Sequence, residues 1–74
     1  MASVSEQDKL RLLLPHWIEH NEGHAKEFRR WAENGGPARE DILRAAAHLE
    51  EANQILTRAL KILGGPLEHH HPYD

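Results

Sequence analysis

Apolar residues recur every three or four positions along two long stretches of the chain, and this spacing predicts two amphipathic helices. The first stretch covers residues 5–33, and its apolar positions are Leu10, Leu13, Leu14, Trp17, Ala25, Phe28, Trp31 and Ala32. The second covers residues 37–63, with Ile42, Leu49, Leu56 and Leu63 in one seven-residue row and Ala45, Ala52 and Ala59 in the row between. Large residues alternating with small ones favour close packing of this second helix against the first.

The two stretches are separated by one short break, Asn34-Gly35-Gly36-Pro37. Asn and Gly readily end a helix in the left-handed conformation, and Pro is favoured at the first position of the next helix. Because the connection is short, the two helices become antiparallel neighbours. In the first stretch, Ser5 followed by Asp8 resembles a helix cap, and Pro15 predicts a kink or a fresh helix start. The predicted fold class is all-α, an antiparallel helical hairpin with coiled-coil-like packing.

The second stretch carries more apolar surface than one partner helix can cover. Two further rows flank the heptad positions, one of His48, Ile55 and Ile62 and the other of Ala46, Asn53 and Leu60. This surplus predicts association, and a C2 dimer of hairpins forming a four-helix bundle is the simplest closed solution. We expect residues 1–63 to form a hairpin domain for metal binding and dimerisation, and residues 64–74 a flexible tail that contains histidines.

The composition of the chain limits which ligands and which functions are possible. The chain has 74 residues, no cysteine and a net charge of −3, so thiolate ligands and disulfides are excluded and binding to nucleic acid is not expected. The longest apolar run, Leu12 to Leu14, is too short to cross a bilayer, and the polar N-terminus does not resemble a secretory signal. We therefore expect a cytoplasmic protein without membrane contact. No nucleophile–base pair or cofactor fingerprint is present, so we do not expect an enzyme.

Three histidines at a spacing of four residues, His16, His20 and His24, carry the clearest chemical signal. On a helix they form one stripe of imidazoles, and imidazole is the commonest ligand for zinc, copper, nickel and iron. An i, i+4 pair can grip one ion, but His16 and His24 are about 12 Å apart along a helix axis. A complete ligand set therefore needs another helix or a second chain. We expect Trp17 to shield the site.

The hairpin suggests further ligands on the second helix. With the turn centred on Gly35 and Gly36, His48 lies level with His24, and Glu51 lies level with His20. We therefore interpret His48 and Glu51 as additional ligands or as hydrogen-bond partners of ligands. Gly23 is unfavourable inside a helix by about 1 kcal/mol relative to Ala, which suggests that another segment approaches closely there.

The tail contains a second group of imidazoles, His69, His70 and His71. The run that starts at Leu67 is similar to the beginning of an expression tag, but it continues as Pro72-Tyr73-Asp74. Both origins, a native histidine tail and a tag remnant, stay open from the sequence.

The segment from His16 to His24 resembles the hallmark of the CooJ-type nickel accessory proteins of carbon monoxide dehydrogenase. Their motif is His, then Trp or Phe, two residues, His, three residues and His, and all four positions match here. The resemblance implies a cytoplasmic helical homodimer that binds Ni(II) at its interface through His16, His20 and His24, with Trp17 as a packing neighbour and His69, His70 and His71 as the tail. The tail departs from the family in having only three histidines and no cysteine, which puts storage of several ions per chain in doubt.

Two functions follow from these patterns. The first is a nickel metallochaperone or nickel store that delivers Ni(II) to a nickel enzyme or its maturation proteins; Zn(II), Cu(II) or Co(II) can substitute, since nickel itself rests on the resemblance. The second is a dimerisation or adaptor module whose histidines are structural or sense pH and bind no specific metal.

Overall fold

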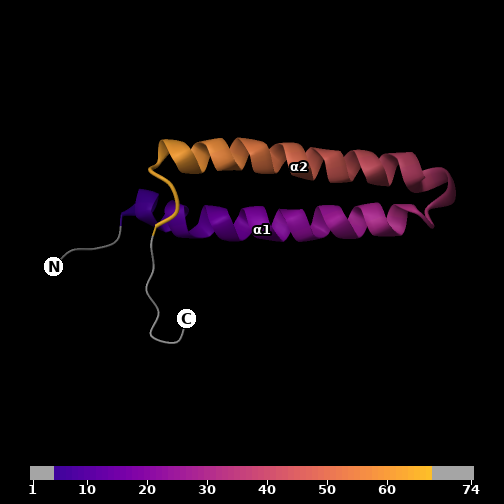
Figure 1. Cartoon of the computed structure of the whole chain (residues 1–74), viewed down its shortest axis with the longest axis horizontal. Coiled ribbons are helices and arrows are strands. Elements are labelled where there is room, and N and C mark those ends of the chain that lie inside the picture. The colour runs from indigo at the N-terminus through magenta and orange to yellow at the C-terminus, as the bar shows by residue number, and fades with distance from the viewer. Residues whose placement is uncertain (1–4, 68–74) are drawn as a thin grey trace, which may run out of the picture.

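The computed structural model describes residues 5–67, which form two long antiparallel helices joined by a tight turn (Figure 1). Helix α1 spans Glu6–Ala32, a short 3₁₀ helix, η1, spans Gly36–Ala38, and helix α2 spans Arg39–Ile62. The Ser5 hydroxyl caps α1 by accepting a hydrogen bond from the Asp8 amide at 3.0 Å. The sequence prediction of an antiparallel helical hairpin is confirmed.

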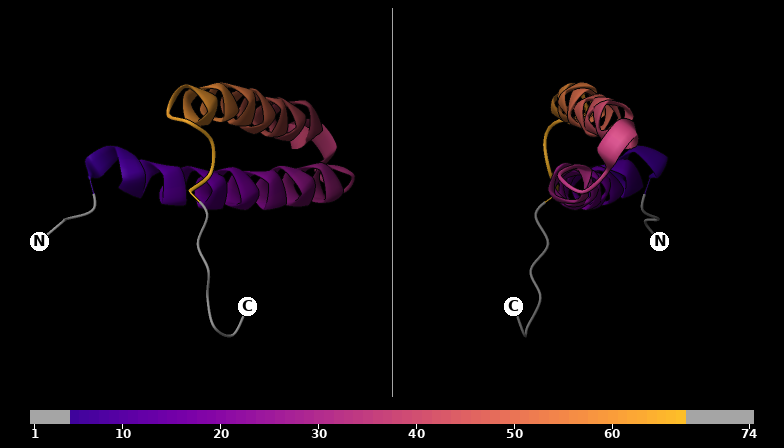
Figure 2. Two further views of the ribbon diagram at one scale, coloured as in Figure 1. Left: turned by 60° about the vertical axis from the view of Figure 1, so that its left-hand side comes forward. Right: turned by 90° about the vertical axis from the view of Figure 1, so that its right-hand side faces the viewer.

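Helix α1 runs unbroken through Pro15 rather than restarting there. Proline has no amide hydrogen, so the carbonyl of Arg11 loses its partner within the helix. The chain beyond α2 crosses back over α1 (Figures 1 and 2), and the Leu67 amide donates to this carbonyl at 3.4 Å. The Arg11 side chain in turn donates to the carbonyl oxygens of Gly65 at 2.8 Å and Gly64 at 3.3 Å. We call this set of hydrogen bonds the Arg11 clasp.

The turn is longer than its two glycines suggest, because η1 lies between Gly35 and the start of α2. Gly36 has φ +55°, in the left-handed region that favours glycine. This extra turn changes how the helices pair. Asn53 contacts the Asn21 side chain, three residues beyond the level that a turn centred on the glycines predicts, and also the carbonyl of Ile18, which lies at that predicted level. The observed register therefore departs from the predicted one by up to three residues.

The contact between the helices, which we call the seam, uses one row of residues from each. These residues are Leu14, Ile18, Asn21, Ala25, Phe28 and Ala32 in α1, and Ile42, Ala46, Leu49, Asn53, Leu56, Leu60 and Leu63 in α2. Within the described residues the buried apolar side chains are Leu14, Ala25, Ala32, Ala46 and Leu60. The predicted alanine row is only partly buried: Ala45 is exposed, and Ala52 and Ala59 are half-buried. The more buried row beside the large residues of α2 is that of Ala46, Asn53 and Leu60.

Complementary shapes explain this choice of row. In the observed register Ala46 lies level with Phe28, so a small residue faces a large one, and Leu60 lies level with Leu14. The Asn21 amide donates to Asn53 Oδ1 at 3.1 Å, and the Asn53 amide donates to the carbonyl of Ile18 at 3.0 Å. These half-buried amides satisfy each other, which fixes the register of the seam.

The two long sides of the hairpin differ in character. One is polar, and Arg29 there forms two hydrogen bonds with the Glu50 carboxylate, at 2.6 Å and 3.0 Å. These bonds lower the pKa of Glu50 and raise that of Arg29. The opposite side, which we call the apolar side, carries Leu10, Leu13, Trp17 and Trp31 from α1, Ala38 from η1, and Ala45, Ala52, Ile55, Ala59 and Ile62 from α2. Across residues 5–67, no helix has the length and apolar character needed to cross a membrane.

Candidate metal centre on the first helix

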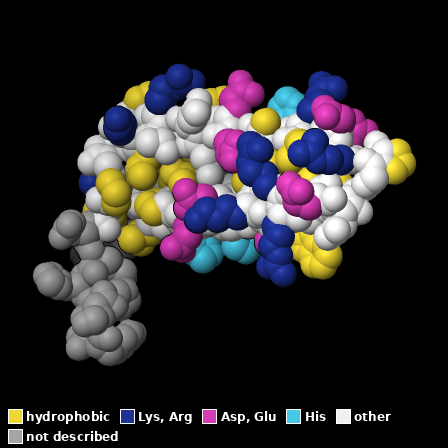
Figure 3. Space-filling model, turned by 45° about the vertical axis from the view of Figure 1, so that its right-hand side comes forward, with side chains coloured by type: hydrophobic (Ala, Val, Ile, Leu, Met, Phe, Trp, Pro, Cys, Tyr) yellow, Lys and Arg dark blue, Asp and Glu magenta, His cyan; other side chains and the backbone are white. Residues whose placement is uncertain are grey.

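Helix α1 places the three predicted histidines in a ladder along its outer surface. The rings of His16 and His20 lie parallel within 10°, with centroids 6.1 Å apart. The rings of His20 and His24 meet edge to face, with centroids 4.8 Å apart. All three side chains are exposed, and histidines are visible at the lower, α1 edge of the molecule in Figure 3. The stripe predicted from the spacing is therefore present and accessible to an ion from solvent.

The ladder does not run straight along α1. His16 points away from the seam, whereas the His24 ring lies 6.3 Å from that of Phe28, a seam residue. Each step of four residues turns by about 40° around a helix, which carries the stripe from the outer surface towards the apolar side. The expected direction of drift is confirmed. The expectation that the imidazoles lie at the edge of a buried region is not met in a single chain, since all three are exposed.

A shallow depression of about 330 Å³ follows the ladder. Its lining consists of His16, Glu19, His20, Gly23, His24 and Glu27, so two carboxylates accompany the three imidazoles. A Cβ atom built on Gly23 would meet no atom within 4 Å. The prediction that this glycine admits another segment is therefore wrong within one chain, because Gly23 faces open space as part of the depression.

One chain alone does not assemble a full set of ligands. Among residues 5–67 no three His, Cys, Asp or Glu side chains are grouped so that they could hold one metal ion. His20 and His24 approach each other most closely, as an i, i+4 pair on adjacent turns. Two imidazoles leave at least two positions of a tetrahedral or larger coordination sphere open. Any further ligands must come from outside the ladder.

The other predicted ligands lie apart from this depression. His48 and Glu51 are both exposed on α2, where His48 Nδ1 lies 3.9 Å from a Glu51 carboxylate oxygen, and neither lines the depression. His69, His70 and His71 lie outside the described residues. Trp17 is 42% exposed and does not line the depression, so it does not shield the stripe within one chain.

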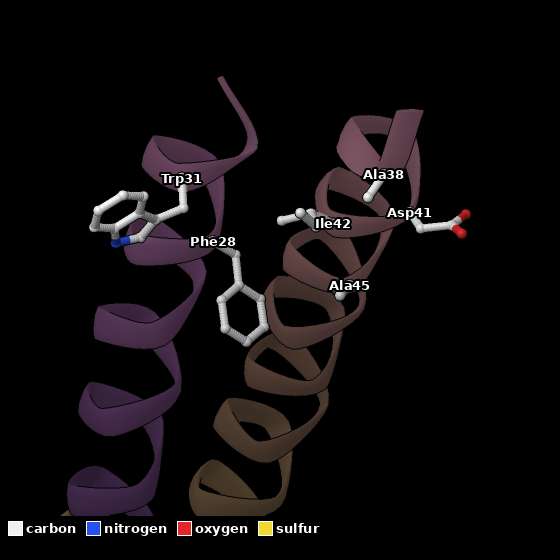
Figure 4. Close-up of a pocket in the computed structure, with 6 residues that line it drawn as sticks. All are labelled: Phe28, Trp31, Ala38, Asp41, Ile42 and Ala45. Atoms are coloured by element: carbon white, nitrogen blue, oxygen red, sulfur yellow. The ribbon is translucent and has the colours of Figure 1, made fainter. Parts of the chain in front are cut away.

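A second hollow was not predicted from the sequence. It is an apolar groove of about 400 Å³ near the turn, lined by Phe28, Trp31, Ala38, Asp41, Ile42 and Ala45 (Figure 4). Phe28 points from α1 towards α2, whereas Trp31 points away from α2 and is 56% exposed. The alanine row was a signal for this groove, because alanines outside the seam leave room beside the seam residues.

Comparison with known proteins gives a family without a described activity. No curated protein and no solved structure matches the chain. A family model described as "Domain of unknown function (DUF8180)" matches residues 10–63. The matched range contains both helices and the whole histidine ladder, and it leaves out the tail. The chain therefore belongs to the DUF8180 family.

Proposed function

We propose that this protein binds Ni(II) as a homodimer in the cytoplasm and carries or stores the ion for a nickel enzyme or its maturation proteins. The observation that carries the proposal is the His20–His24 pair, two exposed imidazoles 4.8 Å apart on adjacent turns of a long helix. Neutral imidazoles at this spacing are suitable ligands for Ni(II) and other borderline divalent ions. The choice of nickel rests on the resemblance of the motif from His16 to His24 to the CooJ-type proteins.

Several features of the site support a carrier. The ladder is open to solvent, so an ion can enter without opening the fold. The available ligands are imidazole nitrogens and carboxylate oxygens, which suit Ni(II). Thiolate ligands, which select softer metals such as Cu(I), are absent from the chain. Glu19 and Glu27 line the same depression, where their carboxylates can accept the second ring N–H of a ligating imidazole.

The apolar side supports the dimer. Of the seven large apolar side chains exposed among residues 5–67, six lie on this side, and Leu12 is the exception. Exposed apolar surface that is contiguous marks a contact surface in a soluble protein. A second copy that covers it would also enclose His24, whose ring lies beside the seam, and would thereby supply the ligands that one chain lacks.

The metal site is tested by titrating Ni(II) into the full chain by calorimetry, with His69, His70 and His71 replaced by Ala so that the tail does not contribute. We expect the substitution His20→Ala to weaken binding about 10–100-fold, the range seen when a metal site loses one supporting group. Gln54→Ala, an exposed change on the polar side of α2, serves as the matched control and should leave the affinity unchanged. Equal affinity in the parent and His20→Ala proteins would refute the proposal.

The same apolar side also favours a second candidate, a dimerisation or adaptor module whose histidines bind no specific metal. Its prediction differs in the titration, which would show only weak binding of Ni(II) that His20→Ala does not change.

A further inference from the structure

The two helices contribute unlike rows to the apolar side. In α1, residues at a spacing of seven are large: Leu10, Trp17, His24 and Trp31. The corresponding row, which begins in η1 and continues along α2, contains only alanine: Ala38 in η1 and Ala45, Ala52 and Ala59 in α2. Both rows border the seam on the same side. The surface of the apolar side therefore projects outwards along α1, where the side chains are large, and is recessed along α2, where they are alanines. A flat partner surface would not fill this step, whereas a second copy turned by 180° about the long axis of the hairpin would.

Two symmetric arrangements can cover the apolar side with a second copy. If both turns lie at the same end, α1 of each chain packs over α2 of its partner, and large rows meet alanine rows. If the turns lie at opposite ends, α1 packs over α1 and large residues meet large ones, while alanines meet alanines. Cores pack to native density when large residues face small ones, so shape favours the arrangement with both turns together.

Charge does not separate the two arrangements, because each sets one carboxylate near an apolar side chain. With turns together, Asp41, which lines the groove, lies as close in level to the partner's Trp31 as Ala45 does. With turns at opposite ends, aligning Leu10 with the partner's Trp31 sets Leu13 close to the partner's Glu27 and buries a carboxylate against an apolar side chain. With both turns at the same end, residues of the same number in the two chains lie at the same height along the hairpin. Leu13 then lies near the partner's Ile62, which is 84% exposed in one chain, and Glu27 lies near the partner's His48.

The groove near the turn fits this partner. With turns together, Trp31 comes to lie over the partner's Ala45, a residue that lines the partner's groove. Figure 4 shows the indole of Trp31 pointing away from its own α2. This orientation leaves the indole available to contact the groove of a second copy. Two helices packed about 10 Å apart and about 33 Å long present a face on the order of 600 Å², close to the roughly 800 Å² per partner of a standard stable interface.

This arrangement completes the metal site. His24 lies level with residue 50 of the partner, which places it about 3 Å along the axis from the partner's His48. We propose that the apolar side is covered by a second copy with its turn at the same end, and that the partner's His48 is the third imidazole of the site begun by His20 and His24. Each dimer then holds two equal sites, and each site takes ligands from both chains. The assignment of His48 rests on the proposed function, since it concerns the same site.

The experiment mixes two inactive variants. His20→Ala removes a ligand from the site on its own α1, and His48→Ala removes one from the site on the partner's α1. In a mixed dimer of the two, one site loses both ligands and the other keeps the native set. Random mixing makes half of the dimers mixed, so about a quarter of all sites should regain the parent affinity for Ni(II). The titrations use the full chain with the tail histidines replaced by Ala.

Each outcome bears on a separate claim. Restoration to about a quarter supports a site shared between chains. No restoration, with both variants weakened, would mean that the ligands come from one chain, and an unchanged affinity in His48→Ala would remove His48 from the site; either result overturns this inference but leaves nickel binding at the ladder intact. If the parent protein itself binds no Ni(II), the proposed function fails as well.

The arrangement of the dimer is tested without metal. Because the chain has no cysteine, single cysteines can be introduced cleanly. A mixture of Leu13→Cys and Ile62→Cys chains should form a disulfide-linked heterodimer on oxidation, and a mixture of Leu13→Cys and Glu27→Cys chains should not. Linkage in the second mixture alone would show turns at opposite ends and refute the arrangement, as would a monomer in sedimentation at millimolar concentration.

Discussion

Leu60→Ala tests whether the seam or the association of two copies carries the stability of the hairpin. Leu60 is 7% exposed and lies level with Leu14, so the two form the largest buried apolar pair at the open end. Removing three carbon atoms loses about 2.4 kcal/mol of burial at about 0.8 kcal/mol each, and an unfilled cavity adds to this. We expect a loss of about 2–4 kcal/mol.

This loss is large for so small a protein. A chain of 74 residues has a total unfolding free energy of about 4–11 kcal/mol. With a urea dependence near 1 kcal/mol per molar, the midpoint of unfolding should fall by about 2 M or more. The assay is urea unfolding followed by circular dichroism at 222 nm, repeated over a hundredfold range of protein concentration.

Ile62→Ala is the matched control, because it removes as many carbon atoms two residues away. Ile62 is 84% exposed in a single chain, so its loss should be felt only at concentrations where a second copy covers it. Leu60→Ala should destabilise at every concentration. If the two substitutions lower the midpoint equally at the lowest concentration, or if Leu60→Ala shifts it by less than about 0.5 M, the seam described above is wrong.

Three further predictions concern the ends, the polar side and the metal. Pro15→Ala restores an amide that competes for the carbonyl of Arg11, so the Leu67 amide should exchange with deuterium faster than in the parent protein; unchanged exchange would argue against the Arg11 clasp. The pKa of Glu50 is lowered by its hydrogen bonds from Arg29, so this pair stabilises the fold above the unfolded pKa of a glutamate and is lost as pH falls through the lower, folded value. The acid limb of a pH–stability curve should therefore flatten in Glu50→Gln, and it should not flatten in Glu40→Gln, an exposed control at the start of α2. If the proposed site binds Ni(II), protons compete with the ion for the imidazole nitrogens, so calorimetric affinity should fall on acidification, and a pH-independent affinity would argue against imidazole ligands.

The helices, the turn and the histidine ladder were all predictable, because each rests on local spacing. Periodicity locates the helices, glycine and proline locate the turn, and i, i+4 spacing by itself puts His16, His20 and His24 on one surface. None of these depends on how the helices meet. The proximity of His20 and His24 could therefore be predicted before the fold was known.

The seam was not predictable in the same way, because each helix carries two overlapping rows with the same three-and-four spacing. Leu13, Trp17 and Trp31 appear more apolar than Ile18, Asn21 and Ala25, yet the second set is the one that packs. Aromatic side chains do not fit a closely packed pair of helices whose opposing row is also bulky, whereas the Asn21–Asn53 pair fits and satisfies its own hydrogen bonds. Periodicity alone does not contain that pairwise information.

The contacts of the second helix were less predictable. η1 begins at Gly36 and shifts the register by up to three residues, and the periodicity of either helix alone does not report that shift. His48 and Glu51 stay predicted ligands, and within one chain they lie beside each other and outside the depression.

The Arg11 clasp has a consequence for the speed of ion exchange. It fastens the open end of the hairpin, while η1 fastens the other, so the ladder is carried by a rod held at both ends. If the proposed site binds Ni(II), the splaying of the two helices of one chain would not be its route of release. The ion would leave by stepwise dissociation of individual imidazoles or by separation of the two chains that share the site. Its residence time would then be set by the metal–nitrogen bonds and by the stability of the dimer.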